Sequence, residues 1–228
     1  KMFVAVNFIL GFPDELFEQQ MDSFKAALKA KLDWNNFYMY QHIKNTELYK
    51  TYGGLGEEYK GSEHGKDNQE PYINPVRAGA FKNYQFDGEL VYGYDVIEIS
   101  NDTVPYRDQL KEIWFTFNYV ANFLRMPALI TESEVRLKTN IRWLEVLSQA
   151  YPDNPAMSCV IYYLKRRLTG CDKGNFEQHA TMAKKQFSDS SYWQDRDAHF
   201  NFSAFLDNEI PSIDPRYSEL ILALEKID

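Results

Sequence analysis

The sequence holds few residues that could carry out chemistry on their own. Its two cysteines, Cys159 and Cys171, do not form a C-x-x-C pair, and none of the four histidines lies at metal-ligand spacing from another histidine or cysteine. The motifs of phosphate-binding loops, serine hydrolases and zinc proteases (G-x-x-x-x-G-K-[ST], G-x-S-x-G and H-E-x-x-H) do not occur. We therefore expect no metal site and can assign no catalytic residue.

The composition indicates a folded protein and argues against some partners. A hydrophobic fraction of 44% over 228 residues is enough to build a core. The formal net charge of −8 argues against a general nucleic-acid binder, which needs a basic surface to displace counterions. No stretch approaches the run of about 20 apolar residues of a membrane span. With no secretory signal and few cysteines, we expect a reduced, cytoplasmic protein without nucleic-acid or membrane partners.

The first part of the chain has the pattern of an α/β protein. An apolar run from Phe3 to Leu10 predicts a strand, and Gly11 and Pro13 then lead into an amphipathic helix that extends to Leu32. A second strand is predicted over residues 36–41. A crossover of this length predicts that the two strands are parallel and that the connection is right-handed.

The remainder is predicted to be nearly all helical. We expect a first domain over residues 1–60, a linker with a short hairpin or strand over 61–101, and a helical bundle or TPR-like domain over 102–228. The fold class is therefore α+β, mostly α. The predicted helix starts and spans are Pro105, a capping box over 131–134, Asn154-Pro155, Asn175, a helix over 192–206, and Asp214-Pro215.

Two short segments resemble the last third of the radical S-adenosylmethionine fold. In that family a late barrel strand reads approximately G-x-I-x-G-x-P-x-E, and Ile9, Gly11, Pro13 and Glu15 match this pattern. Asn7 stands where glycine is usual. The resemblance covers about the first fifty residues.

The second segment follows the second predicted strand. The family's final strand leads into a stretch similar to P-x-P-G-T-x-L-Y, of which Thr46, Leu48 and Tyr49 are present. Farther along, Asn118, Asn122 and Phe123 resemble an N-x-x-x-N-F segment of the cobalamin-binding branch.

The resemblance implies a terminal strand–helix–strand piece of a partial (β/α) barrel that binds its cofactor at the strand ends. It implies that Ile9 packs on the adenine of S-adenosylmethionine and that Gly11 makes room for it, with Tyr40 and His42 at the end of the last strand. The three cysteines that hold the family's four-iron four-sulfur cluster, in C-x-x-x-C-x-x-C, are not in this sequence.

The resemblance therefore implies the C-terminal portion of a longer enzyme, whose partner is the missing N-terminal part. The parent would generate a 5′-deoxyadenosyl radical for methylation or rearrangement of an unidentified small molecule, with cobalamin a possible second cofactor. The isolated chain would be inactive.

One alternative function is open. The chain could instead be a free-standing helical scaffold that binds a peptide or protein and does no chemistry, with Ile9 a core residue and Gly11 a turn residue. In the fragment interpretation, the flank of residues 3–10 has unpaired backbone groups, which predicts either self-association through this first strand or a disordered N-terminal end.

Overall fold

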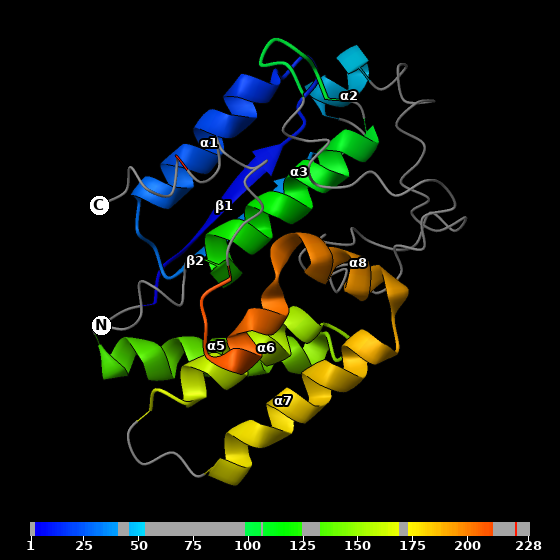
Figure 1. Ribbon diagram of the computed structural model, residues 1–228. Coiled ribbons are helices and arrows are strands. Elements are labelled where there is room, and N and C mark those ends of the chain that lie inside the picture. The colour runs from blue at the N-terminus through cyan, green and yellow to red at the C-terminus, as the bar shows by residue number, and fades with distance from the viewer. Residues whose placement is uncertain are drawn as a thin grey trace.

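The computed structural model describes residues 3–40, 46–52, 99–105, 107–124, 133–168, 173–211 and 222. Within these ranges the chain is mostly helical and has two short parallel strands, as the sequence predicts (Figure 1). Helices α1 and α3 run alongside the strands, while α5, α6 and α7 gather below them (Figure 1). No helix in the described ranges is long and apolar enough to cross a membrane.

The first unit is a strand–helix–strand crossover. Strand β1 spans Ala5–Leu10, helix α1 spans Phe17–Lys29 and strand β2 spans Trp34–Met39. The strands are parallel, as predicted, and β2 begins two residues earlier than its predicted start at residue 36. Their register places Ala5 beside Trp34 and Leu10 beside Met39.

One face of this small sheet is buried by aromatic packing. Phe8 of β1 stacks on Phe37 of β2, with ring centroids 5.1 Å apart. Phe37 lies against Phe24 of α1 at 6.0 Å and against Phe117 of α3 at 5.5 Å. Helix α3 spans Arg107–Tyr119, and a π-helical segment, η4, continues it over Val120–Leu124.

The outer edge of β2 is closed by side chains of α3 and η4 rather than by a third strand. Asn118 accepts a hydrogen bond from the Phe37 N–H and donates one to the Phe37 carbonyl, both at 3.1 Å. Asn122 makes the same pair of bonds to Asn35, at 2.9 and 2.7 Å. The Trp114 indole N–H adds a bond of 2.7 Å to the Phe37 carbonyl.

An asparagine amide suits this position because it carries one donor and one acceptor group, as a peptide unit does. Alternate residues of a strand are about 6.6 Å apart, and residues four apart on a helix are about 6 Å apart. The spacing of the two asparagines along the helix therefore matches the spacing of Asn35 and Phe37 along β2. Each amide also donates to the carbonyl four residues earlier in its own helix, Trp114 or Asn118. We refer to Asn118 and Asn122 as the amide pair.

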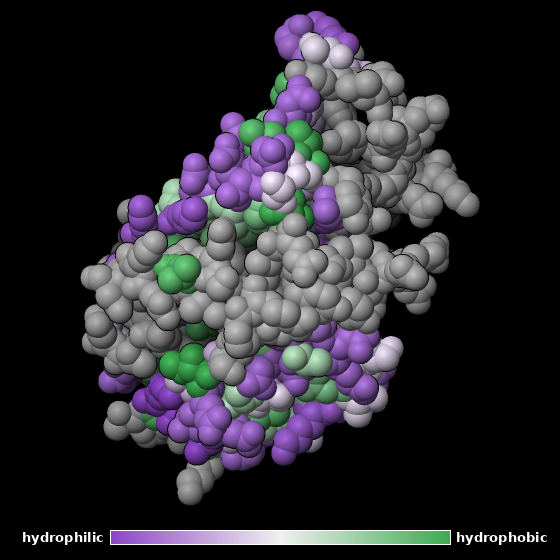
Figure 2. All heavy atoms as spheres, turned by 45° about the horizontal axis from the view of Figure 1, so that its top comes forward, coloured by the Kyte–Doolittle hydropathy of each residue, from purple (hydrophilic) through white to green (hydrophobic). Residues whose placement is uncertain are grey.

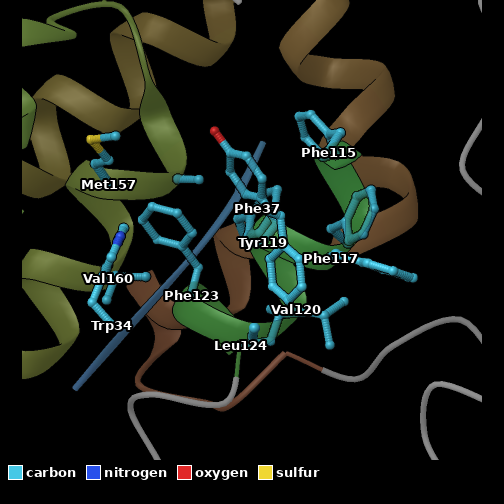
Figure 3. Packing of buried hydrophobic residues seen from close by; sticks show 14 of the residues in the cluster. Trp34, Phe37, Phe115, Phe117, Tyr119, Val120, Phe123, Leu124, Met157 and Val160 are labelled. Atoms are coloured by element: carbon cyan, nitrogen blue, oxygen red, sulfur yellow. The ribbon is translucent and has the colours of Figure 1, made fainter. Parts of the chain in front are cut away.

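The remaining helices form the second layer. Their bounds are α2 Glu47–Tyr52, α5 Glu134–Ala150, α6 Pro155–Lys165, α7 Lys173–Ser188, α8 Ser191–Phe200 and the 3-10 segment η5 Phe202–Asp207. Every residue of α6 is buried. Phe115, Tyr119 and Phe123 stack in sequence along α3 and η4, and Met157 and Val160 of α6 lie nearby (Figure 3).

Some predicted helix boundaries are confirmed and others are wrong. Asn154 caps α6 as predicted. The N-cap of α5 is Ser133, which accepts from the Arg136 N–H, and not the predicted Thr131. Helix α7 already begins at Lys173, so Asn175 lies inside its first turn instead of capping it.

The helix predicted over 192–206 is interrupted. Asn201 has a positive φ of 50°, which ends α8 and starts η5. The hairpin predicted before residue 99 and the helix start at Asp214 lie outside the described residues.

The two predicted structural parts share one hydrophobic core. A single cluster of buried residues extends from Leu10 and Phe24 to Tyr163 and Phe205. Arg136 of α5 also reaches back to Asp33 between α1 and β2, with Nε and Oδ1 2.8 Å apart. The division at residues 60 and 101 stays a prediction, but the described parts on either side pack together.

A buried cationic side chain joins three helices of the second layer. The Lys165 ammonium lies 2.6 Å from the Glu145 carboxylate and 3.2 Å from Nε2 of His179. When the ring is neutral, His179 accepts from this ammonium. Burial lowers the pKa of His179, and the charge of Lys165 lowers it further, while Glu145 opposes the change.

We predict that Asn122→Leu destabilises the protein by about 2–4 kcal/mol, because it leaves both backbone groups of Asn35 without hydrogen bonds. Urea unfolding measures the loss. The matched control is Asn140→Leu, because Asn140 is equally buried but bonds only its own helix, and its Oδ1 has no partner. We expect the control to change stability by less than about 1 kcal/mol. Equal losses in both variants would contradict a special role of the amide pair.

We also predict that His179 contributes to the free energy of unfolding and that this contribution is lost in acid. Since its folded pKa lies below the unfolded value of about 6.5, the unfolded state binds the proton first. The contribution is therefore present above pH 6.5 and is lost as the pH falls towards the folded pKa. His179→Gln keeps a hydrogen-bond acceptor and removes the titration. The difference in free energy of unfolding between the two proteins, measured from pH 8 to 5, should shrink at acid pH. A constant difference would contradict the prediction.

Candidate functional site

The sheet face opposite α1 is the candidate site. Residues Ala5, Asn7 and Ile9 of β1 point to this face, together with Trp34, Asn36 and Tyr38 of β2. At its N-terminal end, Trp34 is covered by Trp143 of α5 and by Phe123. Towards the C-terminal end no helix of the described residues covers it, and Ile9 is 48% exposed. We call this the open face.

A chain of hydrogen bonds runs across the middle of the open face. The Trp34 indole donates to Oδ1 of Asn36 at 2.7 Å, and Nδ2 of Asn36 donates to Oδ1 of Asn7 at 2.9 Å. These bonds fix the orientation of the Asn36 amide. The open face therefore has a polar, preorganised centre beside an apolar C-terminal part.

Aromatic side chains border the C-terminal end of the open face. Phe12 follows β1 and Tyr40 follows β2, and their ring centroids are 4.9 Å apart. Phe12 is 36% exposed. Burial raises the pKa of the Tyr40 phenol, which therefore stays protonated at neutral pH. Ligands of parallel α/β sheets commonly bind at this end of the strands.

The turn from β1 into α1 explains most of the G-x-P-x-E pattern. The Glu15 N–H donates to the Phe12 carbonyl at 3.0 Å, and the third residue of this turn, Asp14, has a φ of 63°. Proline at the second position and a positive φ at the third are the features of a type II turn. The Glu15 carboxylate accepts from the N–H groups of Gly11 and Phe12, which closes the turn.

Position 11 requires a glycine because of its backbone conformation and because a neighbouring side chain leaves no room for a Cβ. Its φ is 79°, and a Cβ at this position would lie 2.2 Å from Cδ2 of Leu110 in α3. The space that the missing side chain leaves is therefore filled by Leu110. The cofactor role of Gly11 stays a prediction.

The N-terminus of α1 is satisfied by the protein itself. The N–H of Phe17 donates to the Thr103 carbonyl at 2.8 Å, and that of Glu18 donates to the Asn101 carbonyl at 3.1 Å. In many α/β proteins such amides bind a phosphate. Here these two amides already have acceptors.

The structure brings together three of the four residues predicted to bind the cofactor. Ile9 lies on the open face, while Gly11 and Tyr40 lie at its C-terminal border. His42 lies outside the described residues. Asn36, Tyr38 and Phe12 were not predicted as site residues, although the period-2 pattern and the parallel register would have placed them beside Asn7, Ile9 and Tyr40.

No metal centre is present among the residues that the structure describes, since no three His, Cys, Asp or Glu side chains gather there. Cys159 lies in the core, where burial raises the pKa of its thiol and keeps it protonated. A protonated thiol is a poor metal ligand. Cys171 is outside the described ranges.

Comparisons with known proteins give no match for this chain, whether with protein-family models, curated proteins or solved structures.

We predict that Gly11→Ala lowers stability by about 2–4 kcal/mol, because it adds both strain at positive φ and a clash with Leu110. Thermal and urea unfolding measure the effect. Leu110→Ala alone and the double variant complete a double-mutant cycle. The double variant should be more stable than the sum of the single losses predicts, since the clash is relieved. Simple additivity would show that Leu110 does not occupy this space.

Proposed function

We propose that this chain is the C-terminal part of a radical S-adenosylmethionine iron–sulfur enzyme. It supplies the last two barrel strands, and its helices cover the substrate. The observation that carries the proposal is the open face, where the half-exposed Ile9 lies near the end of β1, between the hydrogen-bonded Asn7 and Asn36 amides and the rings of Phe12 and Tyr40. An apolar β-branched side chain is normally buried in such a strand. A planar ligand on this face would cover it.

The edges of the sheet support the position of β2 as a last strand. The amide pair occupies the outward backbone groups of Asn35 and Phe37, so at these two residues a further strand has no hydrogen bonds to make. Any additional strands of the sheet would join at β1.

The described residues suit the adenine portion of the cofactor better than its metal cluster. Ile9, Phe12 and Tyr40 offer apolar and aromatic surface at the strand ends, which fits a flat heteroaromatic ring. When bound, the cofactor supplies the radical chemistry, and these residues bind and orient it. The iron–sulfur cluster would be held by cysteines of the N-terminal part of the parent enzyme. Nothing described here contributes specifically to a cobalamin site, because Asn118 and Asn122 are used by the edge of β2.

The alternative, a helical scaffold for a peptide partner, has less support. Its discriminating feature is a contiguous apolar surface on the helices. The large apolar residues exposed on the described helices are Leu48 of α2, Val135 and Val146 of α5, Met182 of α7, and Leu222, and no described cavity or groove joins them. On the face in Figure 2, hydrophobic residues appear as small groups among hydrophilic ones. By contrast, Ile9 and Phe12 lie at the same end of β1, where Phe12 also packs against Tyr40.

The proposal is tested on the longest natural gene product that contains this chain. After anaerobic iron–sulfur reconstitution, it should convert S-adenosylmethionine to 5′-deoxyadenosine under reducing conditions, while the 228-residue chain alone should not. A long product without a C-x-x-x-C-x-x-C motif, or one that forms no 5′-deoxyadenosine, would refute the proposal.

We predict that Ile9→Asp in that enzyme raises the apparent KM for S-adenosylmethionine about tenfold. The reason is that a charged carboxylate replaces an apolar contact worth about 1–2 kcal/mol. Val135→Asp is the matched control, since Val135 is also an exposed β-branched residue, at 65%, and belongs to α5 instead of the sheet. We expect it to leave KM unchanged. An Ile9→Asp enzyme with normal KM would show that the cofactor does not contact Ile9.

A further inference from the structure

The outer edge of β1 carries a row of backbone groups that have no partner among the described residues. The carbonyls of Val4 and Leu10 accept bonds from β2 or the residues beside it, so the even-numbered residues of β1 face β2 and the odd-numbered ones face outwards. No hydrogen bond joins the outward N–H and C=O groups of Ala5, Asn7 and Ile9 to any described residue. The row ends at Gly11, whose N–H is bound by Glu15.

This edge lacks the features that protect exposed strands from pairing. Protected edges carry a charged residue, a proline or a bulge. From Met2 to Phe12 the sequence has no charged residue and no proline. Ala5, Asn7 and Ile9 are exposed, and the pairing of β1 with β2 is continuous without a bulge. The outer edge of β2, in contrast, is closed by the amide pair.

We propose that the 228-residue chain forms a two-fold symmetric dimer in which the β1 strands of two copies pair antiparallel. Placing the two-fold axis at Asn7 puts Asn7 opposite its copy and Ala5 opposite Ile9 of the partner. Each outward residue then exchanges two hydrogen bonds with its counterpart, so no donor or acceptor in the row is left over.

The side chains of this arrangement are self-complementary. Small Ala5 faces large Ile9, which extends the apolar part of the open face across the axis. The two Asn7 amides meet at the axis, where uncharged donor and acceptor groups can pair and no like charges repel. A closed isologous contact of this kind joins two copies and stops. The result is a continuous four-stranded sheet with β2 at both ends.

The dimer does not depend on the proposed cofactor. A strand from the N-terminal part of a longer enzyme would use the same backbone groups of β1, so that strand and the second copy exclude each other. The dimer is therefore a property of the chain as it stands, and loss of S-adenosylmethionine chemistry would leave it intact.

Sedimentation equilibrium of the 228-residue chain tests the proposal, with the protein at 1 to 200 µM. We expect a reversible shift from monomer to dimer, and no larger species. Asn7→Pro removes the outward N–H at the axis while leaving the bonds to β2, because proline is tolerated on an edge strand whose N–H points away. It should weaken dimerisation at least tenfold. Asn7→Ala is the matched control, because it loses the side chain but keeps the N–H, and it should still dimerise.

Hydrogen exchange of the wild-type chain gives a readout that needs no variant. The amides of residues 5, 7 and 9 should exchange more slowly at high than at low protein concentration, while other amides of the sheet stay unchanged. A chain that is monomeric throughout, or a dimer that Asn7→Pro leaves unaffected in a folded protein, would overturn the proposal. So would concentration-dependent protection confined to other surfaces.

Discussion

The amide pair on the edge of β2 is the contact on which the rest of the architecture depends. A two-stranded sheet has two outer rows of backbone groups, and burying such a row without hydrogen bonds is costly. Asn118 and Asn122 satisfy one row and at the same time fix α3 and η4 beside the strand. With the helix held there, Phe117 contacts Phe24 and Phe37. Phe115 and Tyr119 of the same helix pack on Phe200, Trp193 and Phe202 of the second layer.

This arrangement makes the sheet asymmetric in two ways. Among the described residues, one edge is occupied at Asn35 and Phe37 and the other has no partner, and one face is buried by α1 and α3 while the other is covered at its N-terminal end. The open face and the available edge meet at Asn7 and Ile9. A ligand would use the side chains of the face, and a second strand would use the backbone groups of the edge. Because these are different atoms, the two proposals can be tested separately.

The motif residues have folding roles of their own in this chain. Gly11, Pro13 and Glu15 build one turn, in which the glycine accepts a positive φ and the glutamate closes the loop. Asn118 and Asn122 close a strand edge. Support for a cofactor site therefore comes less from these residues than from the exposed apolar surface of Ile9 and Phe12, for which the fold itself has no evident use.

The sequence by itself determined the elements whose signals are local. The period of apolar residues predicted β1 and α1, the crossover length predicted parallel strands, and Asn154-Pro155 predicted the start of α6, because each depends on residues within a few positions of one another. Only the tertiary structure decided which distant residues meet. Asn122 bonds to Asn35, 87 residues away, Leu110 fills the space beside Gly11, and Lys165 is buried between Glu145 and His179. Such contacts arise only when helices dock on the sheet, and no local pattern encodes which helix that will be.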